Sequence, residues 1–343
     1  MARSSGVLAQ TEGDSLSEVV LWPWFAFAVL VALLLALDLL VFHRRDRISS
    51  LRESAAWSVF WIGLGLGFNG LVWWWGIVEG HGSKPGVVFL SGYLLEKSLS
   101  IDNIFIFAVI FHFFGVPAMY QYRVLFWGIL GAIVLRLVFI LAGIELIHRF
   151  AWVAPLFGAF LVYTAYTLAR HAATEVHPEK NVVVKIARRF LRVARGDHRQ
   201  HGHDFFVREN GRWCMTPMFL VLLVIESSDV VFAVDSVPAI IAITDDRFIA
   251  FTSNIFAILG LRALYFLLVG VINIFCYLHY GLAAVLGFVG LKMIAEWWIP
   301  HEEGTQLVSP WVCLVVITLL LGISILASMI AKRRERLMSE DER

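Results

Sequence analysis

The chain has 343 residues, of which 59% are hydrophobic and only 16% are charged. Soluble domains carry about 25% charged residues, so this composition excludes an ordinary water-soluble protein and indicates an integral membrane protein. The 28 Lys and Arg residues are balanced by 27 Asp and Glu residues, which argues against a basic nucleic-acid-binding surface. The three cysteines are scattered and lack CxxC spacing, so the sequence predicts neither a disulfide framework nor a thiolate metal site.

Apolar runs of about 20 residues, the length that crosses a hydrocarbon core, predict nine transmembrane helices and therefore an all-α polytopic membrane protein. A polar segment at 1–19 precedes the first two spans, and the last span is followed by a tail at 332–343. The nine predicted spans are 20–42, 56–78, 86–111, 123–145, 150–170, 216–243, 248–272, 276–299 and 309–331.

The positive charges predict the orientation of the chain. Much of the Lys and Arg lies in the loops 43–55 and 171–215 and in the tail at 332–343, and all three fall on the same side of the membrane in a count of nine spans. By the positive-inside rule that side is cytoplasmic. We therefore expect a multi-pass protein of a bacterial inner or plasma membrane, with its N-terminus outside and its C-terminus in the cytoplasm.

The long cytoplasmic loop at 171–215 contains three distinct segments. Residues 182–195 place apolar side chains at helical spacing among Lys and Arg, which predicts a helix on the inner membrane surface. Residues 205–213 include an Asn-Gly pair, the signature of a β-hairpin. The stretch GDHRQHGHD at 196–204 is either a solvated polar loop, the reading we favour, or a metal-sensing cluster.

Charged residues at membrane depth cost roughly 3 kcal/mol each, so their positions are informative. They gather in two spans, the third with the sequence EKSLSIDN and the sixth with ESSDVVFAVDSVP. The later spans of each half carry isolated basic residues, and Asp38 and Glu296 lie near the ends of the first and eighth spans. The charged residues on which the prediction rests are Glu96, Lys97 and Asp102, Glu226, Asp229 and Asp235, and Arg136, Arg262 and Lys292.

The distribution of these residues repeats along the chain. Aligning 100–109 with 227–236 superposes Asp102 on Asp229, and the next arginine follows 34 residues after the first and 33 after the second. The segment 156–165 also resembles 285–294, which places Tyr163 opposite Lys292. These similarities predict a duplicated unit of three helices, at 86–170 and 216–299. A unit with an odd number of spans must be inverted in its second copy, which is a transporter signature.

Helix geometry limits what the acids can do together. Asp229 and Asp235 differ by about 120° around one regular helix, so a single straight helix cannot bring both to one ion. Pro238 predicts a kink in the sixth span, and the serines beside Asp102 favour a local break in the third. With both helices interrupted, we expect Asp102 and Asp229 to face each other across the repeat interface.

The ligand types in these two segments predict the substrate. Carboxylate, amide and hydroxyl oxygens suit Mg²⁺, Ca²⁺ or Mn²⁺ better than copper or zinc. Candidate metal ligands are Glu96, Asp102, Asn103, Glu226, Asp229 and Asp235. Supporting polar or charged residues are Ser98, Ser100, Ser228, Asn254, Arg136, Arg262, Lys97 and Lys292.

The residues predict a secondary transporter of a divalent cation that works by rocking of the two repeats. A buried carboxylate can release a proton when a cation arrives, so proton exchange is a natural form of coupling. The main alternative is a non-transporting assembly or stress factor whose buried charges only pair with one another. No Ser/His/Asp set, HExxH motif or nucleotide-binding loop is found, so we expect neither an enzyme nor a bound cofactor. The oligomeric state is left open.

At these motifs the chain resembles the TerC family of membrane proteins, close to its Alx branch, which is related to the LysE-type exporters. The resemblance rests on the segments 95–111, 216–244, 248–268 and 286–294. It implies export of Mn²⁺, protection against metal excess and metalation of exported enzymes; some members are linked to tellurite resistance or to thylakoid protein insertion. By this resemblance the polar membrane positions of the family fall on Glu96, Asp102, Asn103, Glu226, Asp229, Asp235 and Asn254.

Overall fold

The computed structural model of the chain describes residues 8–42, 50–170, 204–209, 211–269, 277–299 and 307–341. It consists of two units, Met1–Ile48 and Ser49–Arg343. The first unit contains the helix α1 (Leu8–Phe42). Its segment Trp22–Leu40 is long and apolar enough to cross a membrane.

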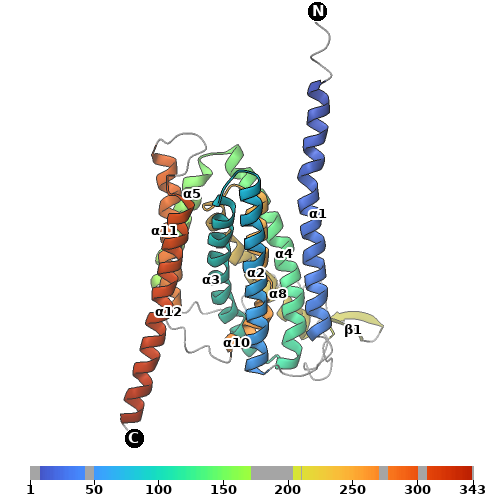
Figure 1. Cartoon of the computed structure of the whole chain (residues 1–343). Helices are drawn as coiled ribbons and strands as arrows, with labels where there is room; N and C mark the ends of the chain where they lie inside the picture. The colour runs from blue at the N-terminus through green and yellow to red at the C-terminus, as the bar shows by residue number, and fades with distance from the viewer. Residues whose placement is uncertain are drawn as a thin grey trace, which may run out of the picture. The chain divides into compact units, whose positions relative to one another are not determined.

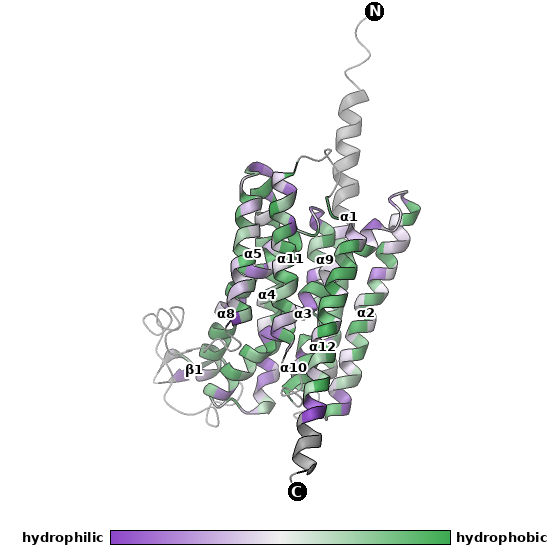
Figure 2. Ribbon diagram, turned by 90° about the vertical axis from the view of Figure 1, so that its left-hand side faces the viewer, coloured by the Kyte–Doolittle hydropathy of each residue, from purple (hydrophilic) through white to green (hydrophobic). Residues whose placement is uncertain are grey.

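The second unit is a helical bundle with one short hairpin (Figure 1). Hydrophobic residues cover most of the length of its helices (Figure 2). The all-α polytopic membrane architecture predicted from the sequence is therefore confirmed. The elements of this unit are α2 (Leu51–Val78), α3 (Lys84–Phe113), α4 (Ala118–Arg149), α5 (Val153–Arg170), β1 (Phe206–Glu209), β2 (Arg212–Met215), α8 (Pro217–Ile241), α9 (Arg247–Ile258), α10 (Leu261–Val269), α11 (Leu278–Trp298) and α12 (Pro310–Asp341).

Within the described residues, seven helices are long and apolar enough to span a membrane, and α9 with α10 would together make an eighth. The helix α3 has 30 residues, enough to cross a bilayer, but its middle carries Glu96, Lys97 and Asp102. Length and composition thus support seven or eight of the nine predicted spans.

Two of the helices that position the site, α8 and α9, begin at a side-chain N-cap. The Thr216 hydroxyl accepts from the backbone N–H of Phe219, and Pro217 occupies the first turn of α8, where its missing N–H costs nothing. The Asp246 carboxylate accepts from the backbone N–H groups of Phe248 (2.8 Å) and Ile249 (3.0 Å). Each cap satisfies backbone donors that a helix start otherwise leaves unpaired.

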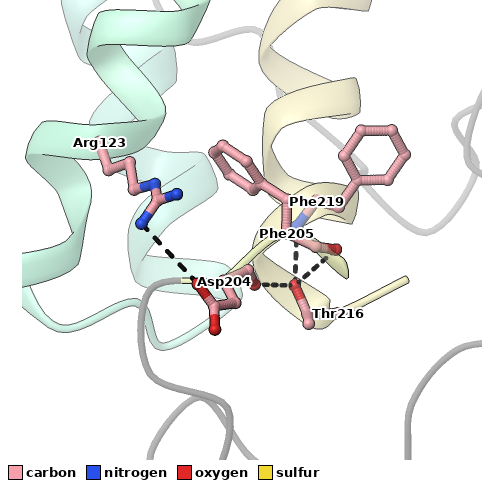
Figure 3. Close-up of polar contacts among 5 residues, drawn as sticks. All are labelled: Arg123, Asp204, Phe205, Thr216 and Phe219. Carbon is pink, nitrogen blue, oxygen red and sulfur yellow. Dashed lines mark hydrogen bonds and ion pairs between the residues drawn. The ribbon is translucent and has the colours of Figure 1, made fainter. Parts of the chain in front are cut away.

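The hairpin predicted at 205–213 is confirmed, and it is anchored to the bundle (Figure 3). Gly211 in its turn has φ 78°, a conformation that glycine adopts without strain. The Thr216 hydroxyl donates to the Asp204 carbonyl oxygen at 2.6 Å. On α4, the Arg123 guanidinium lies 3.9 Å from the Asp204 carboxylate and 5.3 Å from the centre of the Phe205 ring. These contacts attach the hairpin to the starts of α4 and α8.

The helices of the bundle pack in reciprocal pairs. The helix α3 packs on α9 and α8, α4 packs on α8 and α9, and α5 packs on α11. The α5–α11 contact is unusually close at two glycines. A Cβ added to Gly158 would lie 2.8 Å from the Gly290 carbonyl oxygen, and one added to Gly290 would lie 2.7 Å from the Gly158 oxygen. Only glycine permits this approach of two backbones.

The helix break lies in a different span from the two that the sequence indicated. The helix α3 is continuous over Lys84–Phe113, and the Ser98 hydroxyl donates to the Leu94 carbonyl oxygen (2.7 Å) one turn earlier in the same helix. The helix α8 stays helical through Pro238. The seventh span is interrupted instead: α9 and α10 meet at a bend of 40°, where Gly260 has φ 79°. The predicted break in α3 was therefore wrong.

Candidate cation site at a buried ion triad

A small cavity lies in the core of the bundle, beside the α9–α10 break. Its polar lining comes from α3, α4 and α8, and Ile258 and Leu261 line it from the two sides of the break. The free space at its centre is ≈ 20 Å³, about what one water molecule requires. The lining residues are Ser100, Asn103, Phe107, Leu125, Gly128, Ile129, Ala132, Arg136, Ile225, Asp229, Ile258 and Leu261.

An ion triad occupies one side of this cavity. Arg136 of α4 places Nη1 2.5 Å from the Glu96 carboxylate on α3 and Nη2 3.6 Å from the Asp229 carboxylate on α8. The exposed fractions of Glu96, Arg136 and Asp229 are 0%, 1% and 6%. With both acids ionised, the triad carries a net charge of −1. One arginine therefore links three helices without neutralising the site.

Several buried polar atoms around the triad have no hydrogen-bond partner in the structure. They include Asp229 Oδ2, Ser100 Oγ and Arg136 Nε, whereas the Glu96 carboxylate is hydrogen-bonded to Arg136 and to the Asn254 amide. Asn254 is fully buried on α9, beside the Glu96 carboxylate. Buried polar groups in proteins are paired in roughly 90% of cases or more. A cluster of unpaired oxygens beside a water-sized cavity indicates a place for water or an ion.

Glu226 lies one helical turn from Asp229, between α8 and α4. Its half-buried carboxylate packs over Gly131, where an added Cβ would lie 2.2 Å from Glu226 Oε1. Glu226 does not line the cavity, but its charge acts on Asp229. It therefore contributes negative potential at the side of the site.

The other two predicted acids lie outside the cavity lining. Asp235 on α8 accepts a hydrogen bond from the Thr164 hydroxyl of α5 at 3.0 Å. Asp102 is half-buried and is absent from the cavity wall, which its neighbours Ser100 and Asn103 line instead. The cavity thus combines Asp229 with the hydroxyl and amide of α3, whereas the sequence predicted Asp229 opposite Asp102.

Lys97, which is half-buried, and Lys292, which is buried, both cap helix ends. Lys97 Nζ donates to the carbonyl oxygen of Ala257 (3.0 Å), in the last turn of α9. Lys292 Nζ donates to the carbonyl oxygen of Ala242 (2.7 Å), just after α8, and lies 3.2 Å from Glu296. Cations stabilise the negative end of a helix dipole, so these charges serve the fold.

The remaining supporting residues make local contacts. The Arg262 guanidinium is buried, with its carbon 5.8 Å from the centre of the Tyr122 ring. The Ser228 hydroxyl donates to the Val224 carbonyl oxygen at 2.8 Å. Neither residue lines the cavity.

The described residues contain no group of three or more His, Cys, Asp or Glu side chains that could hold a metal ion. Glu96 of α3 and Asp229 of α8 meet through Arg136, and among the predicted acids only Asp229 lines the cavity. The amphipathic segment 182–195 and the histidines of the GDHRQHGHD stretch lie outside the described residues.

Comparison with known proteins identifies the family. The model of the integral membrane protein TerC family matches residues 81–336. The chain belongs to the TerC family. It is 46% identical to the membrane protein STKORF319 of Myxococcus xanthus over 90% of this chain and 92% of that one. It is 47% identical to the putative membrane-bound redox modulator Alx of Escherichia coli K12 over 79% and 85%, and 37% identical to the membrane protein RC1219 of Rickettsia conorii over 90% and 98%. No solved structure matches.

In this TerC protein, the sequence located the acids but missed the residues that position them. Gly131 makes room for Glu226, and Thr164 binds Asp235. Gly128 and Gly131 stand three residues apart on α4, so they share one helix face, and this pair of small residues could have been noticed. Thr164 carries no comparable sequence signal, because a lone threonine in an apolar helix commonly bonds its own backbone.

Proposed function

We propose that this TerC-family chain is a secondary transporter of a hard divalent cation. The observation that supports this best is the water-sized cavity at a helix break, with the unpaired Asp229 Oδ2 and Ser100 Oγ at its wall. An ion there would gain oxygen ligands that now have no partner. Because Asp229 is 6% exposed, its charge is costly without a counter-ion.

The donor set supports the choice of ion class. Asp229 offers a carboxylate, Ser100 a hydroxyl and Asn103 an amide, all hard oxygen donors that suit Mg²⁺, Ca²⁺ or Mn²⁺. Among these ions, Mn²⁺ and the outward direction come from the family resemblance. With so few protein ligands, the ion would keep some of its water.

The reciprocal helix packing supports an inverted repeat. The first helix of each repeat, α3 or α8, packs on the second span of the other repeat, which begins with α9 or is α4. The third helices of the two repeats, α5 and α11, pack on each other. Such equivalent contacts are what a pseudo-two-fold axis relating 86–170 to 216–299 would produce. Inverted repeats with a discontinuous helix at a central site support alternating access by movement of one repeat against the other.

The first test removes the one acid of the cavity wall. Asp229→Asn should reduce Mn²⁺ uptake into proteoliposomes by at least about tenfold, because a neutral amide attracts a divalent ion far less than a carboxylate. Asp245→Asn is the matched control, since Asp245 is exposed between α8 and α9. Equal flux through both variants would contradict the site. Recovery of Asp229→Asn in the membrane would show that loss of flux is not loss of protein.

We further propose that protons move against the metal. A buried carboxylate outside the triad that exchanges its proton as the cation binds would couple the two fluxes while Glu96 and Asp229 stay ionised. An imposed pH gradient, acidic on the side to which Mn²⁺ moves, should therefore accelerate Mn²⁺ flux and be dissipated by it. A flux that is indifferent to the gradient would count against this coupling.

The alternative is a structural or assembly factor, and the pairing of Arg136 with both Glu96 and Asp229 is the observation in its favour. If the triad only holds helices together, Asp229→Asn will remove the protein from the membrane. The transporter proposal predicts a folded, inactive protein instead. The amount of the variant in the membrane, measured beside metal flux, separates the two.

A further inference from the structure

Arg136 holds a position that the general transport scheme does not explain. Arg136 lines the cavity in which the transported metal ion would bind. It is also 1% exposed and cannot lose its proton in proteins. The site therefore contains a permanent positive charge, whether or not an ion is present.

The two contacts of Arg136 are unequal. The distance from Nη1 to Glu96 is 2.5 Å, whereas the distance from Nη2 to Asp229 is 3.6 Å. The arginine is thus held by Glu96 and only approaches Asp229. An arriving cation can replace the longer contact while the shorter one stays in place.

The charge count shows what this arrangement achieves. With both acids ionised, the net charge of the triad is −1 without metal and +1 with a divalent ion bound. The two states therefore carry net charges of equal magnitude. Without the arginine the same acids would carry −2 when empty and 0 when loaded. The cost of placing charge in a low-dielectric medium rises steeply with its magnitude, so loss of Arg136 penalises the empty state most. Glu226 shifts both states in the same direction and does not alter this conclusion.

We infer that the positive charge of Arg136, which Glu96 holds in place, allows the metal-free carrier to reorient toward the side from which it binds metal. This inference rests on the proposed function, and it assigns to Arg136 a step different from metal binding. Net transport requires the empty carrier to reorient. Exchange of metal for metal requires only the loaded carrier to do so.

The test compares these two modes in the same proteoliposomes with radiolabelled Mn²⁺. Arg136→Gln should lower net uptake by at least about tenfold, equivalent to about 1.4 kcal/mol, and leave Mn²⁺/Mn²⁺ exchange within about threefold of the unmodified protein. Glu96→Gln/Arg136→Gln returns the triad to −1 when empty and should restore net uptake. Arg247→Gln, at the exposed start of α9, is the matched control and should change neither mode.

The outcomes are distinguishable. Parallel loss of net uptake and exchange in membrane-inserted Arg136→Gln, or retention of both, would overturn the inference. If Arg136→Gln does not accumulate in the membrane, Arg136→Lys is tested in its place. Because lysine keeps the positive charge, net uptake and exchange should both persist, and a loss of net uptake alone would contradict the inference. Absence of both modes in the unmodified protein would instead refute the proposed transport function.

Discussion

Single side chains of the site were only partly predictable from the sequence. The positions of the acids could be read from it, because a charge inside an apolar run is conspicuous. Their partners could not, because Arg136 lies 40 residues from Glu96 and 93 from Asp229 in the chain. The alternative hypothesis was that the buried charges pair with one another; Lys97 instead donates to a backbone carbonyl oxygen of α9, whereas Lys292 lies 3.2 Å from Glu296. Which partner a buried cation finds depends on helix packing that no local pattern encodes.

At this scale Gly131 gives a prediction about Glu226. Gly131→Ala places a Cβ where the Glu226 carboxylate now lies, and the flexible side chain must move away. We expect the Kd for Mn²⁺ to rise by about tenfold, or about 1.4 kcal/mol, because negative potential is withdrawn from the site. Glu226→Gln should have a similar effect, and the double variant should be no weaker than either single one. Additive losses in binding titrations would show that Gly131 acts independently of Glu226.

Helices were placed well by the sequence, but their interruptions were not. Lengths and caps depend on local residues such as Thr216 and Asp246, which are visible in the chain. At Pro238, α8 remains a single helix, so the kink predicted there stays a prediction. The break in the seventh span depends on Gly260, whose backbone approaches Trp61 of α2. A single glycine in an apolar run has many explanations, so this one could not be singled out.

Gly260→Ala should destabilise the bundle. Its φ of 79° costs a residue with a Cβ roughly 1–2 kcal/mol, and the added atom would lie 2.4 Å from the Trp61 side chain. A lowered Tm in detergent, measured by tryptophan fluorescence, would show this. Gly67→Ala on α2 is the control, since an added Cβ there meets nothing within 4 Å. An unchanged Tm in Gly260→Ala would mean that the break tolerates rearrangement.

The whole molecule was the most predictable level. The lipid requires each spanning segment to be apolar and helical regardless of its neighbours, so runs in the sequence correspond to helices in the structure. The side-by-side order of those helices is not fixed in this way. Packing of α5 on α11 depends on Gly158 and Gly290, which belong to segments 132 residues apart. Orientation stays a prediction from the Lys and Arg distribution.

That orientation can be tested with two cysteine variants. His81, after α2, and Arg208, in the hairpin, are both exposed and are predicted on opposite sides of the membrane. A membrane-impermeant maleimide should label His81→Cys in intact cells and Arg208→Cys only after the cells are opened. The unsubstituted protein measures background from its native cysteines. The reverse labelling pattern would place the N-terminus in the cytoplasm.

The lysine cap on α9 has a consequence for ion discrimination. A broken helix can expose main-chain oxygens, and some ion-selective pores use such oxygens as ligands. Here the Ala257 oxygen is already bound by Lys97. Under the proposed transport function, this oxygen cannot bind the metal, and the preference among metals would depend on the side chains of Ser100, Asn103 and Asp229 at the cavity wall.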